Sequence, residues 1–251
     1  MFDFPGRSIF SARRRVTLRS QAYDDQLRRI IATILAPGRV GVDVGANVGE
    51  ILSAMVAAAP AVSHLAVEPI PQLAEALTSK FPSVRIIHGA LAEQRGQAQF
   101  RVVENSLEES SLRPTTTHQA NPQERWIRVD VSLLDDHVAA NDDVALIKID
   151  AEGAEHSILL GAVKTIARCR PIIVFEAGGN TTPHFGVTPE MFWTFFEQRH
   201  YALTTMDRWL ARHRPFSHAE FVAAYIDHEG LPRWWERGKE WMFLACPAAT
   251  A

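Results

Sequence analysis

The segment VGVDVGANVG, residues 40–49, predicts a buried β-strand that runs into a glycine-rich turn. Valine alternates with glycine and Asp43 up to Val44, and the turn Gly45-Ala46-Asn47-Val48-Gly49 follows. Glycines directly after a strand let the backbone approach a ligand closely and allow a sharp entry into a helix. The first N–H groups of that helix have no partner within it. The segment therefore predicts a ligand site built on a strand, a turn and a helix start.

The rest of the chain alternates strand and helix patterns, which predicts a doubly wound α/β fold with a mostly parallel sheet. Further strands are expected at 64–69, 84–91, 144–150 and 171–178, and helices at 47–59, 71–81 and 153–169. Residues 97–103 and 126–132 alternate with period two and are expected to pair antiparallel. The last third predicts helices at 188–201 and 217–226 and strands at 202–207 and 241–247. Ligands bind such sheets at the carboxyl ends of the strands.

A second acid, Glu68, ends the next expected strand 19 residues after Gly49, where a carboxylate suits the two hydroxyls of a ribose. The Gly-x-Gly-x-x-Gly pattern of a dehydrogenase is absent, and so is a nucleoside triphosphate loop. Asp43 would repel a pyrophosphate but would attract an ammonium group. A ribose, an amino acid and a positive centre together describe S-adenosylmethionine.

Four segments resemble known motifs. VDVGANVG resembles the first motif of class I S-adenosylmethionine-dependent methyltransferases, AVEPIP resembles the second, and IHGAL resembles the segment that lies along the adenine. LIKIDAEGAEHSILLGA, residues 146–162, closely resembles the hallmark of the FkbM-type methyltransferases. This resemblance covers roughly residues 26–247. It implies a Rossmann-like, seven-stranded sheet with an antiparallel last strand, and methyl transfer mostly to hydroxyls of sugars and secondary metabolites.

The resemblance and the strand ends together assign the expected site residues. S-adenosylmethionine is expected to contact Asp43, Gly45, Ala46, Asn47, Gly49, Glu68, Pro69, Gly89, Ala90, Ser111 and Asp150. A hydroxyl acceptor also needs a general base, for which Glu152 is the first candidate and Asp150 and His156 are the others. The competing interpretation of acids at a helix start is helix capping, which applies most strongly to Glu155.

Two other functions remain open at this point. Asp150 and Glu176 could bind a hard divalent cation through oxygen, which would make the chain a Mg²⁺-dependent O-methyltransferase, although metal-free transfer is favoured. A non-catalytic S-adenosylmethionine-binding partner subunit is the alternative from another class, against which the acidic cluster speaks.

Whole-chain properties limit the remaining possibilities. The 251 residues carry a net charge of -3, so no basic field points to nucleic acid, and two cysteines indicate no disulfide framework. No segment resembles a signal peptide or a membrane span, and a cytoplasmic enzyme with a saccharide or other small-molecule acceptor is expected. Residues 1–25 are expected to form an arm, and 26–251 the methyltransferase domain. The polar segment 105–125 and the Trp-rich segment 209–241 are expected to form a lid. The acceptor's identity and the oligomeric state are not indicated.

Overall fold

The computed structural model describes residues 6–35, 38–115, 119, 121–178, 181–225 and 240–248. Its centre is a seven-stranded sheet, formed by β1 Val40–Val44, β2 Leu65–Glu68, β3 Arg85–His88, β7 Val144–Ile149, β8 Ile172–Glu176, β9 Tyr201–Thr204 and β10 Met242–Pro247. The strand order is β3-β2-β1-β7-β8-β10-β9. Only β10 runs antiparallel to its neighbours β8 and β9, so the predicted doubly wound fold is confirmed.

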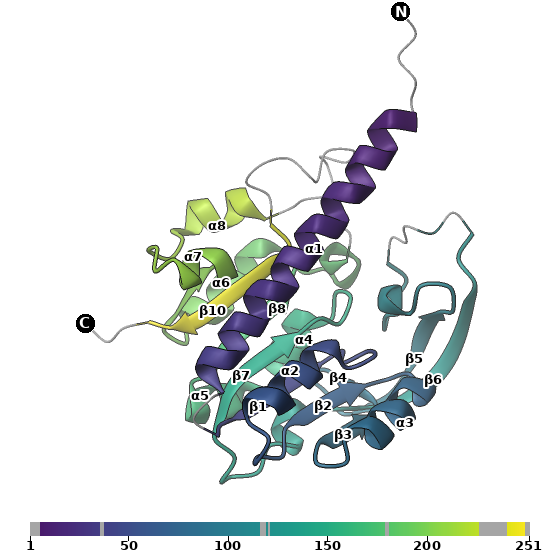
Figure 1. Cartoon of the computed structure of the whole chain (residues 1–251), viewed down its shortest axis with the longest axis horizontal. Helices are drawn as coiled ribbons and strands as arrows, with labels where there is room; N and C mark the ends of the chain where they lie inside the picture. Colours follow the sequence, from purple (N-terminus) through teal and green to yellow (C-terminus); the bar gives the residue numbers. More distant parts are fainter. Residues whose placement is uncertain are drawn as a thin grey trace, which may run out of the picture.

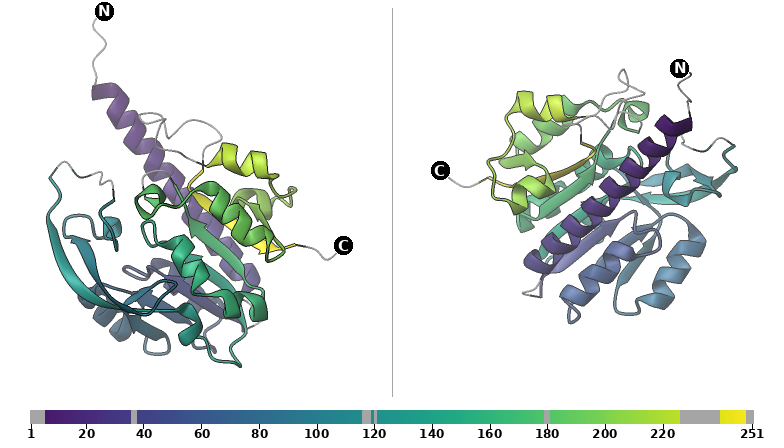
Figure 2. Two further views of the ribbon diagram at one scale, coloured as in Figure 1. Left: turned by 180° about the vertical axis from the view of Figure 1, so that it is seen from behind. Right: turned by 45° about the horizontal axis from the view of Figure 1, so that its top comes forward.

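Helices cover both faces of this sheet (Figures 1 and 2). They are α1 Gly6–Ile34, α2 Glu50–Ala58, α3 Pro71–Lys80, α4 Glu155–Leu160, α5 Val163–Cys169, α6 Pro189–Glu197, α7 Met206–Leu210 and α8 His218–Ala224, with 3-10 turns η1 Leu107–Glu109, η2 Leu134–Asp136 and η3 Thr182–Phe185. Helices α4, α5, α6 and α8 pack on one face, where Ile158 and Phe192 are fully buried. Helices α1, α2 and α7 pack on the other face, where Ile30 and Met55 are fully buried. None of the described helices has the length and apolarity to cross a membrane.

The N-terminal segment differs from the expected arm. Helix α1 continues without a break from Gly6 to Ile34, across the boundary expected after residue 25 (Figure 1). Tyr23, Leu27, Ile30 and Ile31 recur at helical spacing and are buried against the sheet. The second half of α1 is therefore part of the core that packs on the main sheet.

The strand expected at 84–91 is two strands, because Gly89 takes the chain from one sheet to another. A Cβ at Gly89 would lie 2.8 Å from the carbonyl oxygen of Asp130, so only glycine fits this approach. The second sheet consists of β4 Ala90–Leu91, β5 Gly96–Val103 and β6 Glu124–Ser132, in the order β4-β6-β5. Strands β5 and β6 pair antiparallel, as their alternation predicted.

The first part of the polar segment 105–125, which is expected to contribute to a lid, is fastened to the second sheet by the buried guanidinium of Arg101. Its nitrogens donate to the carbonyl oxygens of Glu109 (3.1 Å) and Thr115 (3.2 Å) and to the Thr115 hydroxyl (3.0 Å). The backbone of Ser111 exchanges two hydrogen bonds with that of Arg101. Residues 105–115 thus hold a fixed position beside the main sheet.

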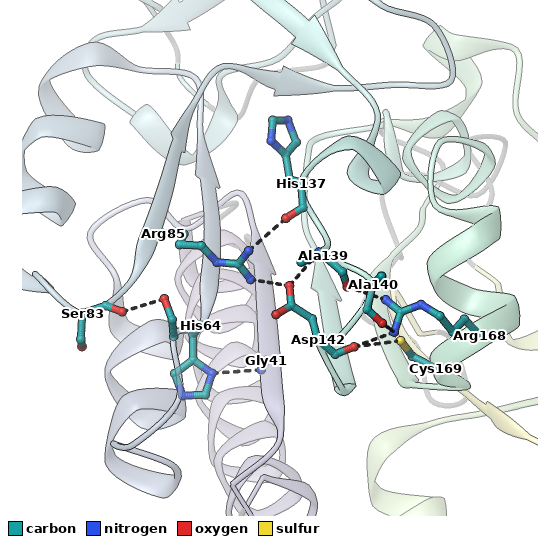
Figure 3. A network of polar contacts seen from close by, with 11 residues as sticks. Gly41, His64, Ser83, Arg85, His137, Ala139, Ala140, Asp142, Arg168 and Cys169 are labelled. Atoms are coloured by element: carbon teal, nitrogen blue, oxygen red, sulfur yellow. Dashed lines mark hydrogen bonds and ion pairs between the residues drawn. The ribbon is translucent and has the colours of Figure 1, made fainter.

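A polar network stabilises the amino ends of the strands, opposite the edge where ligands bind (Figure 3). The Arg85 guanidinium donates to the carbonyl oxygen of His137 (3.2 Å) and to the Asp142 carboxylate (2.8 Å). The imidazole of His64 accepts the N–H of Gly41 at 2.9 Å. The polar side chains at the amino ends of the strands thus make structural contacts. The functional site is therefore expected at the carboxyl ends.

The helix expected at 153–169 is broken into α4 and α5 at Gly161. A Cβ there would lie 2.2 Å from the carbonyl oxygen of Ala92, so the chain passes too closely for any other residue. Helix α5 restarts with a cap from outside: the Asp135 carboxylate accepts the N–H groups of Lys164 (2.9 Å) and Thr165 (2.8 Å) and the Thr165 hydroxyl (2.7 Å).

Replacing Asp135 by alanine should therefore leave the start of α5 without acceptors and lower the free energy of unfolding by about 1–2 kcal/mol. The Asp135→Asn variant, which keeps one oxygen, should lose less. Urea unfolding of both variants measures the difference. Equal stability of Asp135→Ala and the wild type would show that α5 does not depend on this cap.

Candidate functional site

A cavity of about 650 Å³ opens at the carboxyl ends of β1, β2, β7 and β8. This volume lies in the usual range for small-molecule sites. Of the expected cofactor residues, the lining includes Asp43, Gly45, Ala46, Asn47, Glu68, Pro69, Gly89, Ala90 and Asp150. The sequence motifs therefore meet at one edge of the sheet, although Asp150 follows Asp43 by 107 residues and Glu68 by 82.

The turn after β1 has the geometry that its glycines predicted. Gly45 has a φ of 75°, and a Cβ on it would lie 1.9 Å from the carbonyl oxygen of Asp150. Asn47 is also left-handed, with a φ of 48°. Because Gly45 has no side chain, the ends of β1 and β7 can approach each other closely. Together they form the floor of the cavity.

A buried lysine, Lys148, lies at the centre of this floor. Its ammonium is 3.3 Å from the Asp43 carboxylate and 3.5 Å from that of Asp150, and it donates to the carbonyl oxygen of Gly45 at 2.9 Å. Burial opposes the charge, but the carboxylates of Asp43 and Asp150 outweigh it and raise the pKa of the Lys148 ammonium. Lys148 therefore stays charged and favours the ionised forms of both acids.

Asp43 is fully buried within β1 yet lines the cavity. Burial raises the pKa of its carboxyl group, while the charge of Lys148 opposes this shift. Among the described residues, neither oxygen of Asp43 has a hydrogen-bond partner of ordinary geometry. A buried carboxylate in this state fits a ligand that brings donors or positive charge.

Glu68 lines the cavity at the end of β2, and its carboxylate fixes two loops. One oxygen accepts the N–H of Asn47 and the other that of Ile70, both at 2.9 Å. A carboxylate has about four lone-pair sites, so it can accept further donors beside these two. Burial raises the pKa of the Glu68 carboxyl group.

Three carboxylates meet where β7 and β8 end. Asp150, Glu152 and Glu176 each offer an oxygen within 4.8 Å of the other two. Glu152 occupies a left-handed turn, with a φ of 53°. Burial and the neighbouring Asp150 raise the pKa values of Glu152 and Glu176, whereas Lys148 outweighs the burial of Asp150 and lowers its pKa. Asp150 is therefore the ionised member, and the other two hold protons more readily.

Glu155 fixes the turn between Asp150 and α4. This is the helix-capping role that the sequence suggested for it. One oxygen of its buried carboxylate accepts the N–H groups of Ala151 (2.8 Å) and Gly153 (3.2 Å). Its other oxygen has no hydrogen-bond partner among the described residues. Burial raises the pKa of Glu155 to about 7, against the opposing effect of the backbone donors.

Three of the expected site residues lie elsewhere. His156 is buried on α4, and its ring packs edge-on against Phe192 at 5.5 Å, outside the cavity lining. Gly49 packs against α3, because a Cβ there would lie 2.7 Å from Leu77. The Ser111 hydroxyl donates to its own loop, and the neighbouring Ser110 lines the cavity in its place.

Sequence reasoning missed the part of the lining that comes from α1, namely Ser20, Tyr23, Asp24 and Leu27. The helical spacing of Tyr23 and Leu27 predicts a helix, but nothing local shows that it covers the cavity. The sequence also did not predict that acids outnumber bases in the cavity lining. The charged residues there are Asp24, Asp43, Glu50, Glu68, Glu108, Asp150, Glu152 and Glu176 against Lys148.

The raised pKa of Glu155 predicts a pH effect on stability. Because folding raises this pKa from 4.5 to about 7, the stabilising contribution is present below pH 4.5 and is lost as the pH rises through 7. The wild type should lose about 2 kcal/mol more stability between pH 5 and pH 8 than Glu155→Gln, which keeps the oxygen that binds the backbone. Urea titrations at both pH values measure this difference. Parallel pH dependence in the two proteins would contradict the assignment.

Comparison with protein-family models gave a match to the methyltransferase FkbM domain over residues 43–210. This segment begins within β1, contains β2, β7 and β8, and includes the acids Asp43, Glu68, Asp150, Glu152 and Glu176. Comparison with curated protein sequences gave no match.

Several solved structures are similar. A methyltransferase FkbM from Methylobacillus flagellatus KT is 16% identical, with a TM-score of 0.47, and the match covers 83% of this chain but 43% of that one. A TehB-like SAM-dependent methyltransferase from Corynebacterium glutamicum is also 16% identical, with a TM-score of 0.43 and coverage of 98% and 100%. A SAM-dependent methyltransferase from Thiobacillus denitrificans in complex with S-adenosyl-L-homocysteine is 14% identical, with a TM-score of 0.39 and coverage of 88% of both chains. By its match over residues 43–210, the chain belongs to the FkbM family of S-adenosylmethionine-dependent methyltransferases.

Proposed function

We propose that this methyltransferase transfers the methyl group to a hydroxyl of a saccharide or natural product, with Glu152 as the general base. The observation that carries the proposal is the position of Glu152, in a left-handed turn between the cavity-lining acids Asp150 and Glu176. S-adenosylmethionine supplies a methyl group already activated on a sulfonium. The protein must therefore align the acceptor, exclude water and remove one proton.

The cofactor residues are proposed from the same edge of the sheet. We assign Glu68 to the ribose hydroxyls, and we assign Asp43, which lines the cavity beside the Lys148 ammonium, to the amino-acid end of the cofactor. The backbone of Gly45 to Asn47 leaves space for close approach. Pro69, Gly89 and Ala90 line the part of the cavity near β2 and β3, which suits the adenine.

The environments of the acids separate their roles. A general base works best when its pKa lies near the operating pH, so an ordinary carboxylate is a weak base for a hydroxyl. Burial and Asp150 raise the pKa of Glu152 and make it a stronger base. Asp150 is held ionised by Lys148 and is better suited to bind the cofactor's ammonium or orient the acceptor. His156 lies outside the cavity lining, which disfavours it as the base.

A divalent cation is the second candidate, because three carboxylate oxygens within 4.8 Å fit the oxygen ligands that hard cations prefer. Such an ion would join Asp150, Glu152 and Glu176 and would lower the pKa of a bound hydroxyl directly. In that case Glu152 would be a metal ligand rather than the base. The acids also argue against a non-catalytic partner subunit, since cofactor binding alone gives no reason for three half-buried acids at this edge.

One prediction of the proposed function concerns the cofactor. S-adenosylmethionine and S-adenosylhomocysteine should bind with micromolar affinity, about -8 kcal/mol, and NADH should not bind. Glu68→Ala should weaken binding by about 1–3 kcal/mol, because ribose hydroxyls lose their acceptor. Calorimetry measures both, with the exposed Glu75→Ala as the control and thermal unfolding to verify that the loops held by Glu68 persist. Binding of NADH without response to either sulfur nucleoside would contradict the proposal.

Another prediction of the proposed function concerns the general base. Glu152→Gln should lower turnover about 10²- to 10⁴-fold and leave cofactor affinity within about twofold, while Asp150→Asn should reduce both. Since the raised pKa keeps Glu152 protonated at low pH, wild-type turnover should rise with pH above the ordinary glutamate range, and Glu152→Gln should lack this rise.

Glu75 is exposed on α3, and Glu75→Gln serves as the matched control for Glu152→Gln. Wild-type turnover by Glu152→Gln would exclude Glu152 as the base. Loss of activity with a chelator and its return with Mg²⁺ would support the metal-dependent reaction instead.

A further inference from the structure

We propose that Phe185 is a positioning residue for methyl transfer: its ring holds Gly153, and with it the neighbouring Glu152, in the turn that places the base in the cavity lining. The inference rests on the proposed role of Glu152 as the general base. Phe185 lies on η3, which follows β8, and it is not part of the cavity lining. It would therefore act through Glu152 and would not touch the acceptor.

The turn that carries the base has an unfavourable backbone conformation. Both of its residues have a positive φ, 53° at Glu152 and 108° at Gly153. A glutamate adopts such a conformation only where the surrounding structure holds it there. The position of the Glu152 carboxylate therefore depends on the contacts that the turn makes with its neighbours.

Two neighbours hold this turn. The Glu155 carboxylate accepts the N–H of Gly153 at 3.2 Å, which fixes one side of the peptide backbone. The Cα of Gly153 faces η3 instead. A Cβ added to Gly153 would lie 2.5 Å from two carbon atoms of the Phe185 ring and 2.9 Å from the carbonyl oxygen of Thr181. The ring therefore packs directly against the backbone next to Glu152.

The 3-10 turn η3 is itself firmly anchored. Thr182 is fully buried, and its hydroxyl donates to the carbonyl oxygen of Gly178 at 2.9 Å. The same hydroxyl forms a hydrogen bond with the hydroxyl of Tyr225, at the end of α8. The N–H of Val187 donates to the carbonyl oxygen of Thr182 at 3.1 Å. Phe185 thus extends from a support that is tied to β8 and α8.

The Phe185 ring also contacts the loop of the second sheet. The guanidinium of Arg113 lies over the ring, 5.4 Å from its centroid, which is a favourable cation–π distance. The carbonyl oxygen of Arg113 accepts the Ser111 hydroxyl at 2.6 Å. Arg113 is exposed, so its side chain can be changed without loss of core packing. It offers a second way to disturb the ring that supports Gly153.

The test measures cofactor affinity and turnover separately. S-adenosylhomocysteine binding is measured by calorimetry, and methyl transfer by S-adenosylhomocysteine release with methyl glucoside, methyl mannoside and methyl rhamnoside as acceptors. Phe185→Ala should lower turnover at least about tenfold and leave cofactor affinity within about twofold, because a small displacement of a reacting group is costly in rate. Phe185→Tyr keeps the ring and should retain turnover within about threefold of the wild type.

Phe216 provides the matched control. It is a half-buried phenylalanine whose ring lies under a guanidinium, that of Arg208 at 4.8 Å, and it is not part of the cavity lining. Phe216→Ala loses a similar amount of packing and should keep wild-type turnover. Arg113→Gln should lower turnover at least about twofold, in the same direction as Phe185→Ala. Thermal unfolding verifies that each variant is folded.

A crystal structure of Phe185→Ala with S-adenosylhomocysteine reads the position of the base without an acceptor. In the wild type, one oxygen each of Asp150, Glu152 and Glu176 lies within 4.8 Å of the others. In Phe185→Ala the Glu152 carboxylate should lie beyond this distance from Asp150 and Glu176, and the cofactor should remain in place.

Wild-type turnover by Phe185→Ala, or an unchanged Glu152 in its crystal structure, would overturn the inference. An equal loss of turnover in Phe216→Ala, or a parallel loss of cofactor affinity in Phe185→Ala, would indicate general destabilisation and would also overturn it. If Phe185→Ala does not fold, wild-type turnover by Arg113→Gln would overturn it. Failure of the wild type to methylate any of the three acceptors would contradict the proposed saccharide acceptor instead, and the crystal structure then decides the inference.

Discussion

The ammonium of Lys148 lies between the carboxylates of Asp43 and Asp150, where β1 and β7 end side by side. A buried ion pair is stable only when both partners and their remaining donors are satisfied, and removal of one partner leaves an uncompensated charge. The Lys148 ammonium also donates to the carbonyl oxygen of Gly45. The close approach at Gly45 brings these groups together, since any side chain there would collide with Asp150. The turn, the two acids and the lysine therefore form one unit.

This unit divides the acids of the site into two sets. Asp150 is next to Lys148 and is held ionised, whereas Glu152 and Glu176 are pushed toward their protonated forms by burial and by Asp150 itself. Lys148 thus holds Asp150 ionised, and Asp150, together with burial, raises the pKa of Glu152 two residues further along the chain. Glu155 contributes by fixing the turn between the two sets.

The parts of the fold that depend on local pattern were predictable from the sequence. The alternation of apolar strands and helices indicated the sheet, and Ser217 with Glu220 forms the capping box that its spacing predicted. Breaks caused by long-range packing were not predictable: Gly161 and Gly89 interrupt their elements because distant backbone, at Ala92 and Asp130, approaches them. For the same reason the motifs indicated Asp43, Glu68 and Glu152 as site candidates, whereas the contribution of α1 depends on tertiary contacts that no local pattern encodes. Of the Trp-rich segment, Trp209 packs in the core with α1 and Trp241 lines the cavity, while Trp234 and Trp235 lie outside the described residues.

The most direct test of this account is a crystal structure of the chain with bound S-adenosylhomocysteine. The account predicts the ribose hydroxyls on Glu68, the amino group of the ligand on Asp43 or Asp150, and the sulfur facing Glu152, with the Lys148 ion pairs unchanged. A ligand bound away from this edge of the sheet, or a sulfur on the side remote from Glu152, would contradict it.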